Sequence, residues 1–169
     1  SLSCGLARRG KKVAVIDSEN RSASKYVGIV EDGVAWQFDV LELTSCSPSE
    51  YRSAIEDAGR EGYDVVVIDS LSHAWEGKDG ALELKDRKGG NSFTAWKDIT
   101  PMHRGMIDAI LGSPCHVIAT MRSKTEYVVE VDSNGKSVPR KVGTAPIQRA
   151  GMEYEFDIYG SLDWSHIMN

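Results

Sequence analysis

Three short apolar runs, each followed by polar residues, constrain the fold of this chain more than any other feature. They are Lys12–Asp17 (KVAVID), Val65–Asp69 (VVVID) and His116–Met121 (HVIATM). Each run is rich in β-branched residues and bounded by turn signals, which predicts a strand buried on both faces. Strands of this kind belong to a mostly parallel sheet covered by helices. The sequence therefore predicts an α/β fold.

Helical patterns lie between these strands. Ser47-Pro48-Ser49-Glu50 fits a capping box with Pro at the first helical position, and Gly62 predicts the end of that helix. Apolar residues at helical spacing predict a second helix over 92–111, with a kink or restart at Pro101. Residues 76–91 are charged and glycine-rich, which predicts a loop, with a short helix as the alternative.

The remaining pattern is extended. Residues 34–43 are expected to hold a strand around Phe38–Leu43. Residues 126–142 indicate a β-hairpin that turns at Asn134-Gly135, a pair that suits a type I′ turn. A further strand is predicted over Glu153–Tyr159.

Composition limits the class of protein. The chain has 169 residues, 41% of them hydrophobic, and a net charge of −5, which fits one globular domain over residues 1–169. No apolar run approaches the roughly 20 residues of a membrane span. The basic stretch Arg8–Lys12 interrupts the place where a signal peptide needs its apolar core. The three cysteines lack the spacing of a zinc site and are expected to be thiols in a reducing cytoplasm: Cys4, Cys46 and Cys115.

Polar residues follow the predicted strands, at the sheet edge where parallel sheets bind ligands. Asp69, after four apolar residues, completes a Walker B pattern and can hold Mg²⁺ against nucleotide phosphates. Glu19, in Asp17-Ser18-Glu19, is a carboxylate that could orient and deprotonate a water attacking a γ-phosphate. Each motif alone also has a structural reading: a strand that ends in Asp, or a solvated loop charge or helix cap.

The third strand is followed by a polar residue and then by cations. Thr120, Arg122 and Lys124 could sense and neutralise the charge of a phosphate group. A flexible basic loop is the structural alternative for this segment.

Taken together, KKVAVIDSEN, YDVVVIDSLSHA and HVIATMRSK, in this order, resemble the RecA-like ATPases. The likeness is to the members common in bacteriophages, some of which are linked to single-strand annealing and recombination. Residues 140–149 and the stretch after them resemble the closing segment of that domain, so the likeness covers nearly the whole chain. It implies a three-layer RecA-like P-loop NTPase core with a C-terminal β-hairpin.

The resemblance also implies roles for single residues. Asp69 corresponds to the Walker B carboxylate, which binds Mg²⁺ through water, and Glu19 to the catalytic glutamate. Thr120 departs from the sensor glutamine of the family. The residues then expected to bind nucleotide phosphates are Ser70, Thr120, Arg122 and Lys124, with Lys141 and Arg149 as weaker candidates at a subunit boundary. ATP, Mg²⁺, a homo-oligomer and single-stranded DNA are the implied partners.

The phosphate-binding loop of the family, G-x-x-x-x-G-K-[ST], does not occur in this sequence. Ser1–Arg9 reads as the second half of the helix that follows such a loop. The loop and its strand are therefore expected upstream of Ser1, and the chain is expected to be an inactive piece of a longer protein, cut at both ends. Without that strand, residues 116–121 would leave an unpaired apolar edge.

Two loops of RecA-like proteins face DNA, and here they correspond to residues 71–97 and 122–142. The first carries one more basic than acidic side chain and the second carries two more, although the whole chain is acidic. Trp75, Phe93 and Trp96 either stack on bases or belong to the core.

Two other functions fit the same residues. One is a non-catalytic module that binds DNA or a partner subunit through the same surface. The other is a different α/β nucleotide enzyme, such as a small kinase, in which the carboxylates have other roles.

Overall fold

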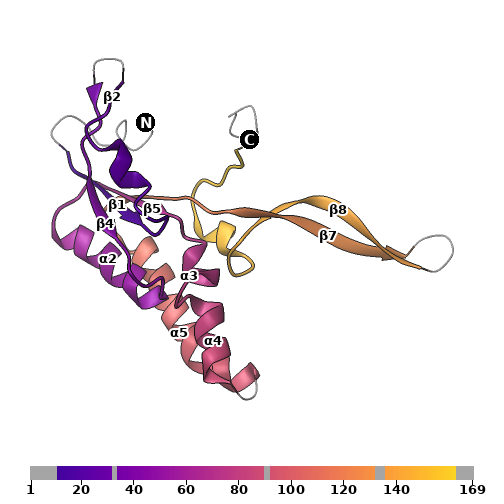
Figure 1. Ribbon diagram of the computed structural model, residues 1–169. Helices are drawn as coiled ribbons and strands as arrows, with labels where there is room; N and C mark the ends of the chain where they lie inside the picture. Colours follow the sequence, from indigo (N-terminus) through magenta and orange to yellow (C-terminus); the bar gives the residue numbers. More distant parts are fainter. Residues whose placement is uncertain (1–10, 32–33, 90–91, 132–135, 163–169) are drawn as a thin grey trace.

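Four parallel strands form the central sheet of the computed structural model, which describes residues 11–31, 34–89, 92–131 and 136–162 (Figure 1). Their order is β4-β1-β5-β6, and every pair of neighbours runs parallel. The strands are β1 (Val13–Asp17), β4 (Asp39–Glu42), β5 (Val65–Asp69) and β6 (His116–Ala119). The predicted α/β fold with a mostly parallel sheet is confirmed, and β6 is two residues shorter than the predicted strand over residues 116–121.

Two long helices, α2 (Pro48–Arg60) and α5 (Ser92–Leu111), pack against one face of this sheet. The buried side chains that join the two layers form one cluster, which includes Ile16, Tyr51, Ile55, Ile68, Met106 and Ile110. The alternate side chains of the central strands, Val13 and Val65 among them, are buried as well. The helix expected over residues 1–9 lies outside the described residues.

The ends of α2 follow the sequence signals. Ser47 is the N-cap, and its side chain accepts a hydrogen bond from the backbone N–H of Glu50 at 3.3 Å. Pro48 occupies the first turn, where its missing N–H costs nothing. The helix ends at Arg60, and Gly62 follows with φ of 72°, a left-handed conformation that glycine adopts without strain. In α5, Pro101 lies inside one uninterrupted helix, so no restart occurs there.

Short elements fill the other connections. Helix α3 (His73–Glu76) follows β5, and α4 (Ala81–Lys88) is the short helix expected as the alternative to a loop over residues 76–91. A short 3₁₀ helix, η1 (Ala23–Tyr26), follows β1. It leads into a small antiparallel pair, β2 (Val30–Glu31) and β3 (Val34–Ala35).

A long antiparallel ribbon projects away from the sheet and its helices (Figure 1). It consists of β7 (Ser123–Val131) and β8 (Ser137–Pro146), paired from Ser123↔Pro146 to Val131↔Ser137. The predicted hairpin is therefore confirmed, and it is longer than the range 126–142 expected from the sequence. The turn predicted at Asn134-Gly135 lies outside the described residues.

The strand predicted over Glu153–Tyr159 is wrong. Gly151, with φ of 87°, turns the chain into a 3₁₀ helix, η2 (Met152–Glu155), and irregular backbone follows. Tyr154 and Ile158 are more than four-fifths exposed. Within the described ranges, no strand runs beside this segment, so its backbone has no ladder to join and its apolar residues do not mark a sheet face.

Strand β6 lies at the edge of the sheet and, among the described residues, pairs only with β5. This is the unpaired edge that the sequence predicts for residues 116–121. In the same described ranges, no helix has both the length and the apolar character that a membrane crossing requires.

Candidate functional site

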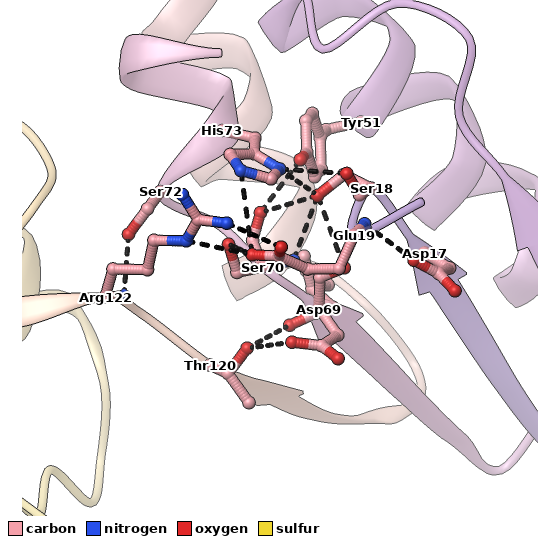
Figure 2. A network of polar contacts seen from close by, with 11 residues as sticks. Asp17, Ser18, Glu19, Tyr51, Asp69, Ser70, Ser72, His73, Thr120 and Arg122 are labelled. Atoms are coloured by element: carbon pink, nitrogen blue, oxygen red, sulfur yellow. Dashed lines mark hydrogen bonds and ion pairs between the residues drawn. The ribbon is translucent and has the colours of Figure 1, made fainter. Parts of the chain in front are cut away.

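The polar residues that follow β1 and β5 meet at one edge of the sheet, as Figure 2 shows. The register of the two strands is the reason, because Asp17 lies opposite Asp69. The next residues, Ser18 and Ser70, therefore leave the sheet side by side. Thr120 joins them from the end of β6, where its backbone N–H donates to Ile68 O at 3.0 Å.

A pair of buried serines ties the two loops together. The backbone N–H of Ser70 donates to Ser18 Oγ at 3.0 Å, and Ser18 Oγ donates to Ser70 O at 3.1 Å. The Tyr51 hydroxyl on α2 donates to the same Ser70 carbonyl at 2.9 Å. All three side chains are buried. Since buried polar groups need partners, this set fixes the spacing of the two loops.

Asp17 shapes the loop that carries Glu19. Its Oδ1 accepts the backbone N–H of Glu19 at 2.6 Å, and its Oδ2 accepts the backbone N–H of Ala23 at 2.8 Å. The side chain is 2% exposed. A carboxylate whose two oxygens are both engaged in the backbone of its own loop holds that loop in place and positions Glu19.

The Glu19 carboxylate has several partners (Figure 2). Ser70 Oγ donates to its Oε1 at 3.0 Å, while Arg122 donates from Nε to Oε1 at 3.1 Å and from Nη2 to Oε2 at 2.6 Å. Burial alone would raise the pKa of Glu19. The hydrogen bonds from Arg122 and Ser70, with the electrostatic effects of His73 and Arg122, outweigh it and lower the pKa.

His73, the first residue of α3, stands beside this carboxylate. Its Nδ1 lies 3.0 Å from Ser18 O and 2.9 Å from Ser18 Oγ. A carbonyl oxygen can only accept, so Nδ1 carries the proton in this contact. The other ring nitrogen, Nε2, then faces Glu19 Oε1 at 3.6 Å. The ring is thus oriented by one loop and directed at the carboxylate of the same loop.

Asp69 and Thr120 form the other half of the site. The Thr120 hydroxyl donates to Asp69 Oδ1 at 2.6 Å. In the described part of the chain, no three His, Cys, Asp or Glu residues gather as a metal cage. A single carboxylate at a strand end nevertheless suits Mg²⁺, which usually binds through one or two carboxylates, waters and phosphate oxygens. Asp69 is therefore the residue that would hold Mg²⁺.

The predicted phosphate-binding residues do not all come together. Ser70, Thr120 and Arg122 lie within the polar network, and the backbone N–H of Arg122 donates to Ser72 Oγ at 2.9 Å. Lys124 is exposed on β7, where it pairs with Ala145 of β8, and its side chain makes no hydrogen bond or ion pair to another described residue. Arg149 follows β8 in the chain and donates its backbone N–H to Gln148 Oε1 at 2.8 Å. Gln148 in turn donates from Nε2 to the carbonyl of Leu71, the residue after Ser70, at 2.9 Å.

Two of the predicted stacking residues contact each other. The rings of Trp75 and Trp96 are stacked with centroids 5.5 Å apart, and the ring of His103 meets Trp75 edge-on at 5.6 Å. Both indoles are half-buried and lie outside the core cluster, so base stacking and core packing both stay open for them. The side chain of Phe93 lies outside the described residues.

A cavity of about 620 Å³ lies away from the polar network, between α2 and α5. Its lining includes Arg52, Gly59, Asp108 and Pro114 and none of the residues at the strand ends. The chemistry of the chain is therefore concentrated at the sheet edge and not in this cavity.

Five residues of the network were not predicted as site residues from the sequence: Asp17, Ser18, Tyr51, Ser72 and His73. His73 had a signal, because Asp69-Ser70-Leu71-Ser72-His73 places it within one turn of the strand end. Tyr51 had none, since it comes from a helix whose contact with the Ser70 carbonyl depends on packing alone.

A comparison with protein families decides the class of this chain. A family model described as an AAA domain matches residues 4–167, which is nearly the whole sequence. The chain belongs to the AAA domain family. Nucleotide binding and ATPase activity are what this family implies, and ATP with Mg²⁺ is its general requirement.

One curated protein is also similar in part. Over 90 residues the chain is 34% identical to the ribose import binding protein RbsB of Bacillus subtilis (strain 168). The matched stretch makes up 53% of this chain and 28% of RbsB, so it spans about a quarter of that protein.

Proposed function

We propose that this chain forms the core of a RecA-like ATPase, of the kind found in bacteriophages, that hydrolyses ATP in DNA recombination, annealing or repair. The observation that carries the proposal is the meeting of Glu19 and Asp69 at one sheet edge. Ser70 bridges them, since it follows Asp69 in the chain and its hydroxyl donates to Glu19 Oε1 at 3.0 Å. A base and a metal-binding carboxylate at adjacent strand ends are what phosphoryl transfer to water requires.

In the proposed reaction, Glu19 accepts a proton from the water that attacks the γ-phosphorus. The new bond joins the water oxygen to phosphorus, and the bond from phosphorus to the bridging oxygen of ADP breaks. Asp69 would hold Mg²⁺, which would offset the charge of the phosphates. The Asp17 carboxylate keeps Glu19 in place by accepting the backbone N–H of Glu19. Ser70 orients the carboxylate of Glu19, and Thr120 orients that of Asp69.

The phosphates also need a glycine-rich loop, and this sequence contains no G-x-x-x-x-G-K-[ST] motif. We place that loop on a strand that pairs with the open edge of β6. Two features support this position. Strand β6 has no second neighbour among the described residues, and its carboxyl end, at Thr120, adjoins Asp69.

Single-stranded DNA is the proposed partner of the β7–β8 ribbon, and a homo-oligomer the proposed assembly. The ribbon projects from the core, and exposed Lys124 and Arg140 lie along it. The ribbon begins next to Arg122, which contacts Glu19, so a ligand bound at this end of the ribbon would lie near the proposed base in space. Free, buried Cys46 and Cys115 fit the proposed cytoplasmic location.

The test uses the protein expressed from its natural gene. We expect Mg²⁺-dependent ATP hydrolysis, and a loss of about 10²–10⁴-fold in turnover for Glu19→Gln with ATP binding retained. Asp69→Asn should lose both turnover and the Mg²⁺ dependence of binding. The matched control is Asp57→Asn, which removes an exposed carboxylate of α2 that pairs with Arg60. DNA binding without any ATP hydrolysis would favour the non-catalytic alternative.

A further inference from the structure

The two oxygens of the Glu19 carboxylate are both held by Arg122. The guanidinium donates from Nε to Oε1 and from Nη2 to Oε2, and Ser70 Oγ adds a second donor at Oε1. A carboxylate has about four lone-pair positions, so three donors leave little room for a water. Hydrogen bonds to the charged form also make the carboxylate a weaker base. In this arrangement Glu19 is poorly suited to take a proton.

Arg122 is able to change partners without moving its backbone. Its N–H donates to Ser72 Oγ at 2.9 Å, and its carbonyl accepts from the N–H of Ile147 at 2.7 Å. These contacts fix the root of the β7–β8 ribbon. The side chain, by contrast, is half exposed. A swing of the guanidinium into solvent or toward a ligand therefore leaves no buried cation, and the Glu19 carboxylate, which is 23% exposed, keeps Ser70 Oγ as a donor.

A phosphate group competes with Glu19 for the same donors. The planar guanidinium binds a carboxylate or a phosphate through two parallel hydrogen bonds, and it cannot bind both with the same pair of N–H groups. Arg122 lies in the segment just after β6. Thr120, in the same segment, contacts Asp69 through its hydroxyl. A phosphate held at Asp69 through Mg²⁺ would therefore lie near the guanidinium.

We infer that Arg122 exchanges partners on nucleotide binding: it holds Glu19 when the site has no ATP, and it moves to the γ-phosphate when ATP binds, which frees Glu19. The inference rests on the proposed function, because it assumes that ATP binds at this edge. It adds a form of regulation in which Glu19 becomes available as a base only when the γ-phosphate is present. Hydrolytic competence is then absent in the resting protein.

Binding affinities of matched variants test the exchange without any measure of turnover. If Arg122 must leave Glu19, Glu19→Gln weakens the competing pair and should tighten binding of a non-hydrolysable ATP analogue with Mg²⁺. The expected gain is about fivefold, which corresponds to about 1 kcal/mol for a partly exposed ion pair. ADP lacks the γ-phosphate and should show no gain. In the double variant Glu19→Gln/Arg122→Gln, the gain should disappear.

Two further variants serve as a matched control and as a second test of the exchange. Asp108→Asn removes the partner of Arg104 on the exposed side of α5 and should leave both affinities unchanged. Arg122→Gln with Glu19 intact should weaken binding of the analogue but not of ADP, which keeps the test open if Glu19→Gln does not fold. Calorimetry on the protein expressed from its natural gene gives all these values.

The outcomes separate the two proposals. Equal affinities of the natural protein and Glu19→Gln for the analogue, an equal gain for ADP, or a gain that persists without Arg122 would overturn the exchange. Each of these results leaves ATP hydrolysis by Glu19 and Asp69 standing. Failure of the natural protein to bind ATP at all would overturn the proposed function, and the exchange with it.

Discussion

Ser18 and Ser70 lie 52 positions apart in the chain and hold each other through two hydrogen bonds. The backbone N–H of Ser70 donates to Ser18 Oγ, which donates in turn to the Ser70 carbonyl. This contact joins the loop of Glu19 to the loop of Asp69. The geometry of the proposed site therefore depends on Ser18, which has no part in the proposed chemistry.

Ser18→Ala should lower the free energy of unfolding by about 1–3 kcal/mol, because it leaves the buried N–H of Ser70 without an acceptor. Urea denaturation measures the change. The control is Ser24→Ala, where an exposed hydroxyl donates to Glu42 at 3.2 Å. A loss at position 18 no larger than that at position 24 would contradict the clamp between the two loops.

Asp17→Asn should destabilise the protein by about 1–3 kcal/mol, since an amide offers one acceptor where the carboxylate offers two to the N–H groups of Glu19 and Ala23. Thermal or urea denaturation gives this value. Asp39→Asn is the comparison, because Asp39 accepts a hydrogen bond from Tyr63 at the surface. If both changes cost the same, Asp17 has no special role in holding the loop of Glu19.

Ser47→Ala should cost about 1 kcal/mol of stability through loss of the helix cap. The Ser47 side chain accepts the N–H of Glu50 at 3.3 Å, and the same N–H also donates to the Ser47 carbonyl at 3.0 Å. Ser53→Ala, on the exposed face of the same helix, should be neutral or slightly stabilising because Ala has the higher helix propensity. The prediction fails if the two substitutions have the same sign and size.

His103 should make stability depend on pH. Burial lowers its pKa below the usual 6.5, although a hydrogen bond with Gln148 opposes the shift and nearby Arg149 adds to it. Below about pH 6.5 the unfolded chain therefore binds a proton that the folded chain does not, and stability falls as the pH falls toward the folded-state pKa. Above about pH 6.5 the contribution of His103 to stability is constant.

Denaturation curves between pH 7.5 and about pH 5 test this behaviour. His103→Gln should flatten the pH dependence, whereas His116→Gln, at an exposed histidine, should leave it unchanged. If the free energy of unfolding falls equally with decreasing pH in the natural protein and in His103→Gln, a group other than His103 controls the loss of stability in acid.

Much of the fold could be predicted because its signals are local. The run VVVID ends in Asp69 at the residue where β5 ends, and Ser47-Pro48 marks the first turn of α2. The prediction of a strand over Glu153–Tyr159 failed. The apolar residues of this segment fit a strand pattern, but a strand also needs a neighbouring strand, which the pattern does not reveal. The segment instead begins with the 3₁₀ helix η2, directly after Gly151 in a left-handed conformation.

The site was predictable only in part. Because parallel strands end at one edge, the sequence placed Glu19, Asp69 and Thr120 near one another. It did not reveal that Arg122 pairs with Glu19. The two residues are 103 positions apart, and their contact depends on the course of the loop after β6. The same applies to Tyr51, whose hydroxyl reaches the Ser70 carbonyl from another layer.

The most direct test of the central claim is the rate of ATP hydrolysis by the protein expressed from its natural gene, measured with and without Mg²⁺ and compared with Glu19→Gln. The account predicts Mg²⁺-dependent hydrolysis that falls by about 10²–10⁴-fold in the variant while ATP still binds. Hydrolysis that continues unchanged in Glu19→Gln, or that does not occur in the natural protein, would contradict the assignment of this sheet edge as an ATPase site.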